Sequence, residues 1–316
     1  MSDVILHHYP LSPYSEKVRL GLGLKGLSYH SVTVPVWMPK PDLMPLTGGY
    51  RRTPVIQVGS DIYCDTPLIL QVIDRMHPKP SFYPGGSAGL ASAVSWWVEK
   101  TVWLPAIYLT TSLIGDHLPA ELVEERKPFF GADISKAATL RDQALNRQRL
   151  HAHLTWAAQM MQDGRRFLLG DAPSAVDLAA YHPIWFVVQN AGQAGEAMLP
   201  MAPLRDWYGR VAALGHGKPS EMSGADALAV ASKSEPAAPA FESEANDPSG
   251  CAPGDHVSVT ADDYGRDPVV GELVACGPEE MVVRRVDPAA GTVHVHFPRA
   301  GFELARAERR SERAAA

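Results

Sequence analysis

The spacing of hydrophobic residues changes twice along this 316-residue chain and divides it into three parts. In the first part, short strand-like runs alternate with segments of helical spacing. The strand patterns cover Val4–His8, Tyr29–Pro35, Val55–Val58 and Ile62–Cys64, and the helical patterns cover Pro13–Lys25 and Pro67–Met76. This order of strand, helix, strand, hairpin and helix predicts a small α/β domain, to which we assign residues 1–80.

The second part, residues 88–232, has helical periodicity throughout, with glycines at its breaks. Within it, Ser174 and Asp177 of "PSAVD" have the spacing of a capping box. Residues 233–250 ("KSEPAAPAFESEANDPSG") have the composition of a linker. We therefore expect an all-helical domain that ends in a linker.

The third part returns to short alternating runs, "HVSVTA", "VVGELVAC", "EMVVRRVD" and "TVHVHF", separated by Gly, Pro and Asp. They predict a small all-β, SH3-like barrel of about five strands over residues 251–305. The charged sequence "ELARAERRSERAAA" that closes the chain is expected to be a frayed helix or tail, and we place the tail at residues 306–316. Because a linker precedes it, we expect the barrel to be a separable domain.

Composition excludes several classes of function. The formal charge of −6 gives no reason to expect nucleic acid as a partner. The most apolar helical segment contains Glu99 and Lys100, and no signal peptide is evident, so we expect no membrane partner. The three cysteines lack CxxC spacing, which predicts neither disulfides nor a zinc site and favours a cytoplasmic location.

Two predicted helices begin with a hydroxyl residue followed by proline, at Ser12-Pro13 and Thr66-Pro67. Such a pair caps a helix, and the free amides of a helix N-terminus also attract anionic groups. Asp65 adds a carboxylate able to pair with an ammonium group. A small peptide that carries a thiol, a carboxylate and an amine would satisfy these groups.

Thr53-Pro54 stands directly before a predicted strand. General statistics favour a trans bond, as in a proline that merely starts an edge strand. A cis bond would instead leave the Thr53 backbone amide and carbonyl to pair with an extended ligand. We expect the cis form because the motifs below place a peptide here.

In their order and spacing, these motifs resemble those of the cytosolic glutathione transferases. "SPYSEKVR" is similar to the catalytic turn of the serine classes, "TPVI" to the cis-proline motif, and "GDAPSAVDLAAY" to the folding motif of the helical domain. The resemblance covers residues 3–233 and implies a thioredoxin-like domain followed by an all-helical domain. The C-terminal β region lies outside it.

The resemblance also implies roles for individual residues. The Ser12 hydroxyl would donate to the sulfur of glutathione, with Ser15 as the rival. Aromatic side chains on helices usually belong to the core, but Tyr14, Trp97 and Tyr108 are the ones we expect at the pocket of a small electrophile. The implied glutathione contacts are Arg52, Thr53, Pro54, Asp65 and Thr66. Asp-Thr stands where the family usually has Glu-Ser or Gln-Ser, and Arg-Thr-Pro where it usually has Lys-Val-Pro.

Two hypotheses follow, both with glutathione as the implied small-molecule partner and a homodimer as the implied assembly. The first is a glutathione transferase that needs no metal and conjugates or isomerises a small electrophile. The second is a non-catalytic binding or regulatory protein that uses its C-terminal β region as an interaction module. His294 and His296 share one face of a strand, and without an evident third ligand we interpret that face as solvated rather than metal-binding.

Overall fold

The computed structural model describes residues 3–307, which divide into two compact units. One unit comprises the described parts of segments 1–9, 30–69 and 220–316, and we call it the sheet unit. The other comprises residues 10–29 and 70–219, and we call it the helical unit. The N-terminal and C-terminal regions of the sequence therefore belong to the same compact unit.

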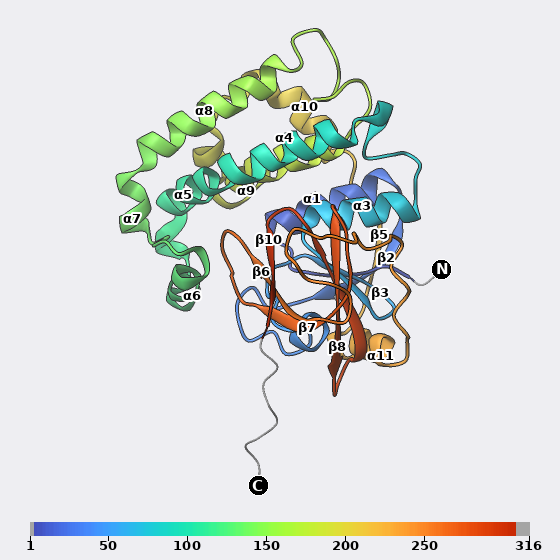
Figure 1. Cartoon of the computed structure of the whole chain (residues 1–316). Coiled ribbons are helices and arrows are strands. Elements are labelled where there is room, and N and C mark those ends of the chain that lie inside the picture. The colour runs from blue at the N-terminus through green and yellow to red at the C-terminus, as the bar shows by residue number, and fades with distance from the viewer. Residues whose placement is uncertain (1–2, 308–316) are drawn as a thin grey trace. The chain divides into compact units, whose positions relative to one another are not determined.

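An open sheet of ten strands forms the centre of the sheet unit, in the order β10-β6-β7-β8-β9-β4-β3-β1-β2-β5 (Figure 1). The pairs β1–β2 and β4–β9 are parallel. The strands are β1 (Ile5–His8), β2 (Ser28–Thr33), β3 (Val55–Val58), β4 (Asp61–Cys64), β5 (Lys218–Glu221), β6 (His256–Ala261), β7 (Val269–Cys276), β8 (Glu280–Asp287), β9 (Gly291–Pro298) and β10 (Phe302–Arg306). Two short helices, α2 (Met44–Thr47) and α11 (Gly224–Ser232), belong to the same unit.

The predicted barrel is wrong in one respect, because the C-terminal strands do not close on themselves. Strand β9 pairs instead with β4, where Asp61 lies opposite His294 and Tyr63 opposite His296. In Figure 1 the orange and red C-terminal strands overlap the blue N-terminal strands, and the β9–β4 pairing joins the two sets into one sheet. A lone β4 edge would expose unpaired backbone groups, and β9 satisfies them.

The end of the described chain also differs from the prediction. Residues 303–306, the start of the charged sequence that predicts a frayed helix or tail, form strand β10 together with Phe302, and β10 pairs with β6. Phe302 and Leu304 alternate into the core and are almost fully buried. The rest of the predicted tail, residues 308–316, lies outside the described residues.

N-terminal and C-terminal strands share one hydrophobic core. Ile62 and Cys64 of β4 pack in the same cluster as Val293, Val295 and Phe297 of β9. All five side chains have less than 1% of their surface exposed. The sheet unit therefore depends on both ends of the sequence for its burial.

Residues 233–250 contain no helix or strand, as their composition predicts, yet they are held against the sheet. The Ala237 amide donates to Asp61 Oδ2 at 3.0 Å, and the Glu244 amide donates to the Cys276 carbonyl at 3.0 Å. Arg299 Nη2 donates to Asp247 Oδ1 at 2.9 Å. This segment is a packed connection rather than a free linker.

The helical unit contains the capping box that the sequence predicts. Ser174 and Asp177 form it at the start of α9, and Asp177 also accepts from the Leu168 amide and from Trp207 Nε1, each at 2.8 Å. Among the described helices, none has the length and apolar content that crossing a bilayer requires. The helices are α1 (Pro13–Leu24), α3 (Thr66–Met76, which begins in the sheet unit), α4 (Ala88–Thr101), α5 (Trp103–Ile114), α6 (Ala120–Phe130), α7 (Lys136–Arg141), α8 (Gln143–Gln159), α9 (Ala175–Glu196) and α10 (Arg205–Ala212).

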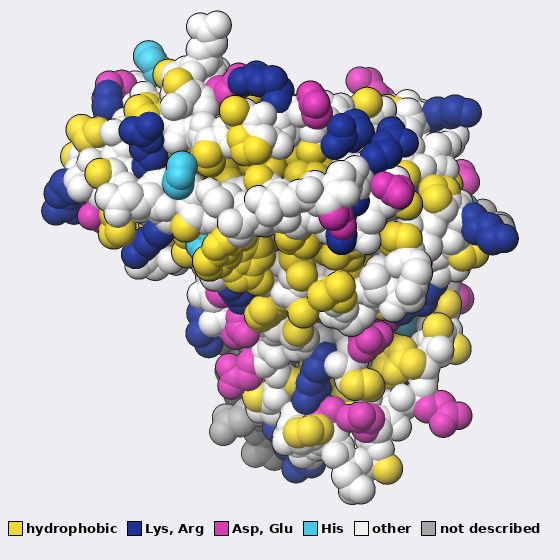
Figure 2. All heavy atoms as spheres, turned by 90° about the horizontal axis from the view of Figure 1, so that it is seen from above, with side chains coloured by type: hydrophobic (Ala, Val, Ile, Leu, Met, Phe, Trp, Pro, Cys, Tyr) yellow, Lys and Arg dark blue, Asp and Glu magenta, His cyan; other side chains and the backbone are white. Residues whose placement is uncertain are grey.

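Some large hydrophobic side chains of the helical unit reach the surface. Leu90, Trp96 and Trp156 are exposed by 57%, 38% and 50% respectively. Figure 2, a view from above, shows hydrophobic side chains lying among Lys, Arg, Asp and Glu side chains. Apolar surface in such mixed surroundings is ordinary for a globular protein.

Candidate functional site

Ser12 lies at the N-terminus of α1, as predicted. Its side chain is buried, and its Oγ accepts from the Ser15 amide at 3.1 Å, so it caps the helix. Because Oγ acts as the acceptor in this contact, the hydroxyl hydrogen is not consumed by it. The same hydroxyl therefore caps the helix and retains a hydrogen for a second partner.

Ser15, the rival, lies one turn inside α1. Its side chain is fully buried, and its Oγ has no hydrogen-bond partner among the described residues. The Ser15 amide is engaged with Ser12, whereas its hydroxyl is not. Ser12 therefore stands at the helix N-terminus, and Ser15 is enclosed behind it.

Pro54 is preceded by a cis peptide bond, which confirms the expectation from the sequence. Thr53 precedes β3, which starts at Val55, and lies outside the ladders that β3 forms with β1 and β4. The pairing of the Thr53 backbone with a ligand stays a prediction.

Asp65 and Thr66 form the junction between β4 and α3. Asp65 has φ 71°, and it is the one non-glycine residue with positive φ in the part of the chain that the structure describes. Such a conformation is uncommon for a side chain other than glycine and is concentrated at functional sites. The Asp65 carbonyl accepts from the Ile69 amide at 3.0 Å, so Asp65 holds the beginning of α3, where Thr66 is buried.

Arg52, the residue expected at the glycyl carboxylate of glutathione, is already paired within the sheet unit. Its guanidinium donates to the Asp263 carboxylate and to the Tyr264 carbonyl, and its Cζ lies 4.2 Å from the centre of the Tyr264 ring. Its Nη1 lies 3.8 Å from Asp65 Oδ2. Burial alone would lower the pKa of Arg52, but Tyr264 and the neighbouring acidic groups raise it above its usual value.

The neighbouring Arg51 is held by the same stretch of chain. Its Nε donates to Asp267 Oδ2 at 2.7 Å. Residues 262–268, which connect β6 to β7 and which we call the acidic connection, thus supply carboxylates to both arginines of "RRTP". The sequence carries no signal that links these segments, because about two hundred residues separate them.

The predicted aromatic residues Tyr14 and Trp97 have different ring neighbours. Tyr14 of α1 packs against Trp103 and His182, with ring centroids 5.1 and 4.7 Å apart. Trp97 packs instead against His153 and Trp156 of α8, with ring centroids 5.2 and 5.7 Å apart. Tyr108 lies half-buried on α5, and burial raises the pKa of its hydroxyl.

A buried ion cluster that sequence analysis missed lies beside Tyr14. Lys17 Nζ is 2.8 Å and His182 Nε2 is 3.2 Å from Glu99 Oε1. Burial alone would raise the pKa of Glu99, but Lys17 and His182 outweigh it and hold that pKa well below its usual value. A charged residue in an apolar helix, Glu99, is the available signal for this cluster, but in the sequence it indicates only that the helix does not cross a membrane.

His294 and His296 lie on one face of β9, but this face is not solvated as predicted. Both side chains are buried, together with Asp61 on β4. His296 Nε2 lies 3.1 Å from Asp61 Oδ1, and its Nδ1 lies 2.7 Å from Glu280 Oε1. Burial alone would lower the pKa of His296, but these two carboxylates raise it. The strand pairing of β4 with β9 supplies the third side chain that the sequence did not reveal.

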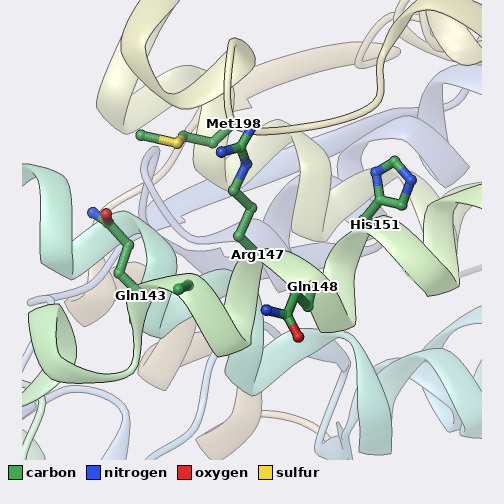
Figure 3. A pocket seen from close by; sticks show the side chains of 6 residues that line it. Gln143, Arg147, Gln148, His151 and Met198 are labelled. Carbon is green, nitrogen blue, oxygen red and sulfur yellow. The ribbon is translucent and has the colours of Figure 1, made fainter.

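A separate pocket of the helical unit lies along α8 (Figure 3). Gln143, Arg147, Gln148 and His151 of α8 line it together with Ala144 and Met198. In Figure 3 the Arg147 side chain extends toward Met198. None of these residues belongs to the predicted site.

With the geometry established, comparison with known proteins identifies the family. Residues 6–81 match the model for the glutathione S-transferase N-terminal domain, and residues 120–210 match the model for the C-terminal domain. The crystal structure of a GST-like protein from Pseudomonas syringae is 36% identical, with a TM-score of 0.80. The match covers 97% of this chain and 100% of that one. This chain belongs to the glutathione S-transferase family.

Membership in the glutathione S-transferase family confirms the resemblance that we inferred from the sequence motifs. Because the Pseudomonas syringae match covers 97% of this chain, the similarity also includes C-terminal strands that the motifs left out. FtsZ-localized protein A from Caulobacter vibrioides is 27% identical over 185 residues, or 55% of this chain and 75% of that protein. A glutathione S-transferase from Rhodospirillum rubrum is 21% identical over 66% of this chain and 87% of its own, with a TM-score of 0.51, and shows the fold alone.

Proposed function

We propose that this glutathione S-transferase family member binds glutathione and activates its thiol for attack on a small electrophile. The observation that carries the proposal is the Ser12 hydroxyl at the N-terminus of α1, which caps the helix and keeps a hydrogen for a second partner. A thiol such as that of glutathione has a pKa near ~8.5. A hydroxyl donor and the positive end of a helix both favour the thiolate, which is the nucleophile.

Residues of the sheet unit support the binding of the peptide itself. The Thr53 backbone is outside the strand ladders and is the proposed partner of the peptide backbone. The Asp65 carboxylate suits the ammonium group of glutathione, and the α3 N-terminus at Thr66 suits its γ-glutamyl carboxylate. Arg52 is the proposed partner of the glycyl carboxylate, which must then compete with Asp263.

The reaction would join the glutathione sulfur to an electrophilic carbon, or isomerise a substrate through such an adduct. Tyr14, Trp97 and Tyr108 remain the proposed contacts of an apolar substrate. Thiolate attack of this kind requires no metal. A homodimer and a cytoplasmic location, both usual in the family, complete the proposal.

Calorimetric titration of the full chain with glutathione, followed by a chromogenic conjugation assay, tests this function. We expect saturable binding and a conjugation rate above the uncatalysed reaction. Ser12→Ala should lower the rate at neutral pH, and Ser15→Ala is the matched control with one buried hydroxyl fewer. Absence of glutathione binding by the wild-type chain would overturn the proposal.

A second candidate is a non-catalytic binding protein, favoured by the pairing of Arg52 with Asp263. In this hypothesis Asp263 of the acidic connection takes the place at Arg52 that the glycyl carboxylate of glutathione would otherwise occupy. The C-terminal strands then contribute an interaction surface. The similarity to FtsZ-localized protein A makes FtsZ the partner to test. Binding of purified FtsZ, with neither glutathione binding nor conjugation, would favour this candidate.

A further inference from the structure

Three side chains capable of binding a metal ion converge where the C-terminal strands join the N-terminal ones. The parallel register of β4 and β9 places Asp61 opposite His294 and Tyr63 opposite His296, so Asp61, His294 and His296 share one face of the sheet. Their exposures are only 5%, 4% and 4%. Each offers one ligand atom, and the three atoms lie within 4.8 Å of one another.

The distances between these atoms suit a small transition-metal ion. His296 Nε2 lies 3.1 Å and His294 Nδ1 lies 3.8 Å from Asp61 Oδ1. A tetrahedral Zn²⁺ with bonds of about 2.0–2.1 Å places its ligand atoms about 3.3 Å apart. The two distances to Asp61 Oδ1 lie on either side of that spacing.

We propose that Asp61, His294 and His296 bind a divalent transition-metal ion, with Zn²⁺ as the best match. Two imidazoles and one carboxylate are donors that Zn²⁺ accepts, and a water would complete its coordination. The ion would join β4 to β9 and thereby fix the C-terminal strands to the N-terminal sheet. This role is independent of glutathione binding.

The surroundings of the ligands match those of protein metal sites. Glu280 Oε1 lies 2.7 Å from His296 Nδ1, the ring nitrogen that faces away from Asp61. The Ala237 amide donates to Asp61 Oδ2 at 3.0 Å. Such outer contacts fix the orientation of metal ligands, most typically through a carboxylate on the far nitrogen of a histidine.

His294 distinguishes a metal site from an ordinary hydrogen-bonded cluster. Its Nδ1 is buried, points toward Asp61 at 3.8 Å, and has no hydrogen-bond partner among the described residues. Buried polar atoms are nearly always paired. The contacts of His296 with Asp61 and Glu280 explain those three side chains without a metal, but they leave the Nδ1 atom of His294 unexplained.

One neighbouring cation has to be considered. Arg284 on β8 lies opposite His294 in the ladder, on the same face of the sheet. Its Nη1 donates to Glu272 Oε1 at 2.9 Å, at a position where both side chains are more than 40% exposed. A paired and hydrated guanidinium opposes a nearby metal ion only weakly.

Metal titration of the untagged full chain, after removal of metal with a chelator, tests the proposal. We expect one equivalent of Zn²⁺ to bind with submicromolar affinity and to raise the melting temperature. Co²⁺ in place of Zn²⁺ should give the visible absorption of a four-coordinate site. His294→Gln should weaken Zn²⁺ binding at least a hundredfold, and since its Nδ1 is unpaired, the metal-free variant should melt close to the wild type.

Asp61→Asn provides a second ligand variant, in case one substitution impairs folding. His256→Gln on β6 of the same sheet is the matched control and should bind Zn²⁺ like the wild type. The proposal is overturned if the wild-type chain shows no saturable Zn²⁺ binding. It is also overturned if His294→Gln and Asp61→Asn both bind Zn²⁺ as tightly as the wild type.

Discussion

Arg52 donates to the carboxylate of Asp263, a residue that stands 211 positions later in the sequence. The same arginine is the proposed partner of the glycyl carboxylate of glutathione. Two carboxylates therefore compete for one guanidinium, and one of them is permanently attached to the protein. The C-terminal strands thus bear directly on a candidate ligand-binding group.

Removing the competing carboxylate should strengthen glutathione binding. Asp263→Asn keeps the size of the side chain but removes its negative charge, so the ion pair with Arg52 becomes a weaker hydrogen bond to a neutral amide oxygen. We expect a several-fold lower dissociation constant for glutathione, measured by calorimetry. Asp267→Asn, which releases Arg51 instead, is the control. An unchanged or weaker affinity in Asp263→Asn would show that the ion pair only fastens the acidic connection.

Two variants of Ser12 separate its capping role from its proposed catalytic role. Ser12→Ala removes the cap, at a cost of roughly 0.5–2 kcal/mol, whereas Ser12→Gly retains most of the capping preference. Both remove the donor to the thiolate, worth roughly 1.5–3 kcal/mol, and so should raise the pKa of the bound thiol by about 1–2. Conjugation should shift to higher pH in both variants, with stability clearly reduced only in the alanine variant. A glycine variant with the wild-type pH–rate profile would leave Ser12 as a cap alone.

Removing one charged partner of the buried Lys17–Glu99 pair should strongly lower the free energy of unfolding. Glu99→Gln leaves the buried Lys17 ammonium without its carboxylate, a change that typically costs about 3–5 kcal/mol. Urea unfolding should show this loss, and Lys17→Met combined with Glu99→Gln should recover part of it. Glu124→Gln, which breaks an exposed pair with Lys127, should change stability little. Equal effects of the two Glu→Gln changes would contradict the assigned importance of the buried pair.

His7 should make stability depend on pH between about 4 and 6.5. The ring is fully buried in the sheet unit, and this burial lowers the pKa of His7 from 6.5 to about 4. Its Nε2 donates to Gln57 Oε1 at 2.9 Å, since the Gln57 amide nitrogen donates to two backbone carbonyls. In the folded state the His7 imidazole therefore stays neutral down to about pH 4, whereas in the unfolded state it takes up a proton below pH 6.5.

The sign and size of this effect follow from the two pKa values. Because the unfolded chain binds more protons in this window, the stabilisation is complete above pH 6.5 and is lost as the pH falls toward 4. The loss approaches about 3 kcal/mol, at 1.36 kcal/mol per pKa unit. His7→Gln should flatten the stability profile between pH 4 and 6.5, whereas His151→Gln on the exposed face of α8 should not. Parallel profiles for His7→Gln and the wild type would refute the assignment.

Local pattern was sufficient to predict most individual elements. The runs at 55–58, 256–261, 269–276 and 280–287 coincide with β3, β6, β7 and β8, and α1 begins at Pro13 as its hydroxyl–proline start predicts. Alternation of polar and apolar residues and helix caps are properties of neighbouring residues, so one sequence displays them. The position of Ser12 on α1 was predictable for the same reason.

Pairings between distant segments were not predictable in this way. Nothing in the alternation of "TVHVHF" indicates whether β9 closes a barrel or extends along β4, and that choice decides whether His294 meets Asp61. Asp263 likewise reads as an ordinary loop residue until the fold brings it to Arg52. The charged residues after Phe302 concealed a strand because only Phe302 and Leu304 of it face the core.

Truncation provides the sharpest test of this long-range dependence. The sequence pattern predicts that a chain ending at Asn246 stays soluble, but the structure leads to the opposite expectation. Such a chain loses β6–β10, uncovers the edge of β4 and exposes core side chains such as Ile62 and Cys64. Each fully buried large apolar side chain contributes roughly 1.5–3 kcal/mol, so losing several exceeds a domain's usual stability of about 5–15 kcal/mol.

We therefore expect the truncated chain to aggregate or to lose its cooperative unfolding transition, as measured by light scattering and calorimetry. The matched control is the full chain with a protease site inserted at the exposed Ala238 and then cleaved. Cleavage there breaks the covalent connection but leaves β9 paired with β4, so the cleaved protein should stay folded. A monodisperse truncated chain that melts at the temperature of the full chain would contradict this expectation. It would show that the N-terminal sheet is stable with β4 as an unpaired edge strand and does not need the C-terminal strands.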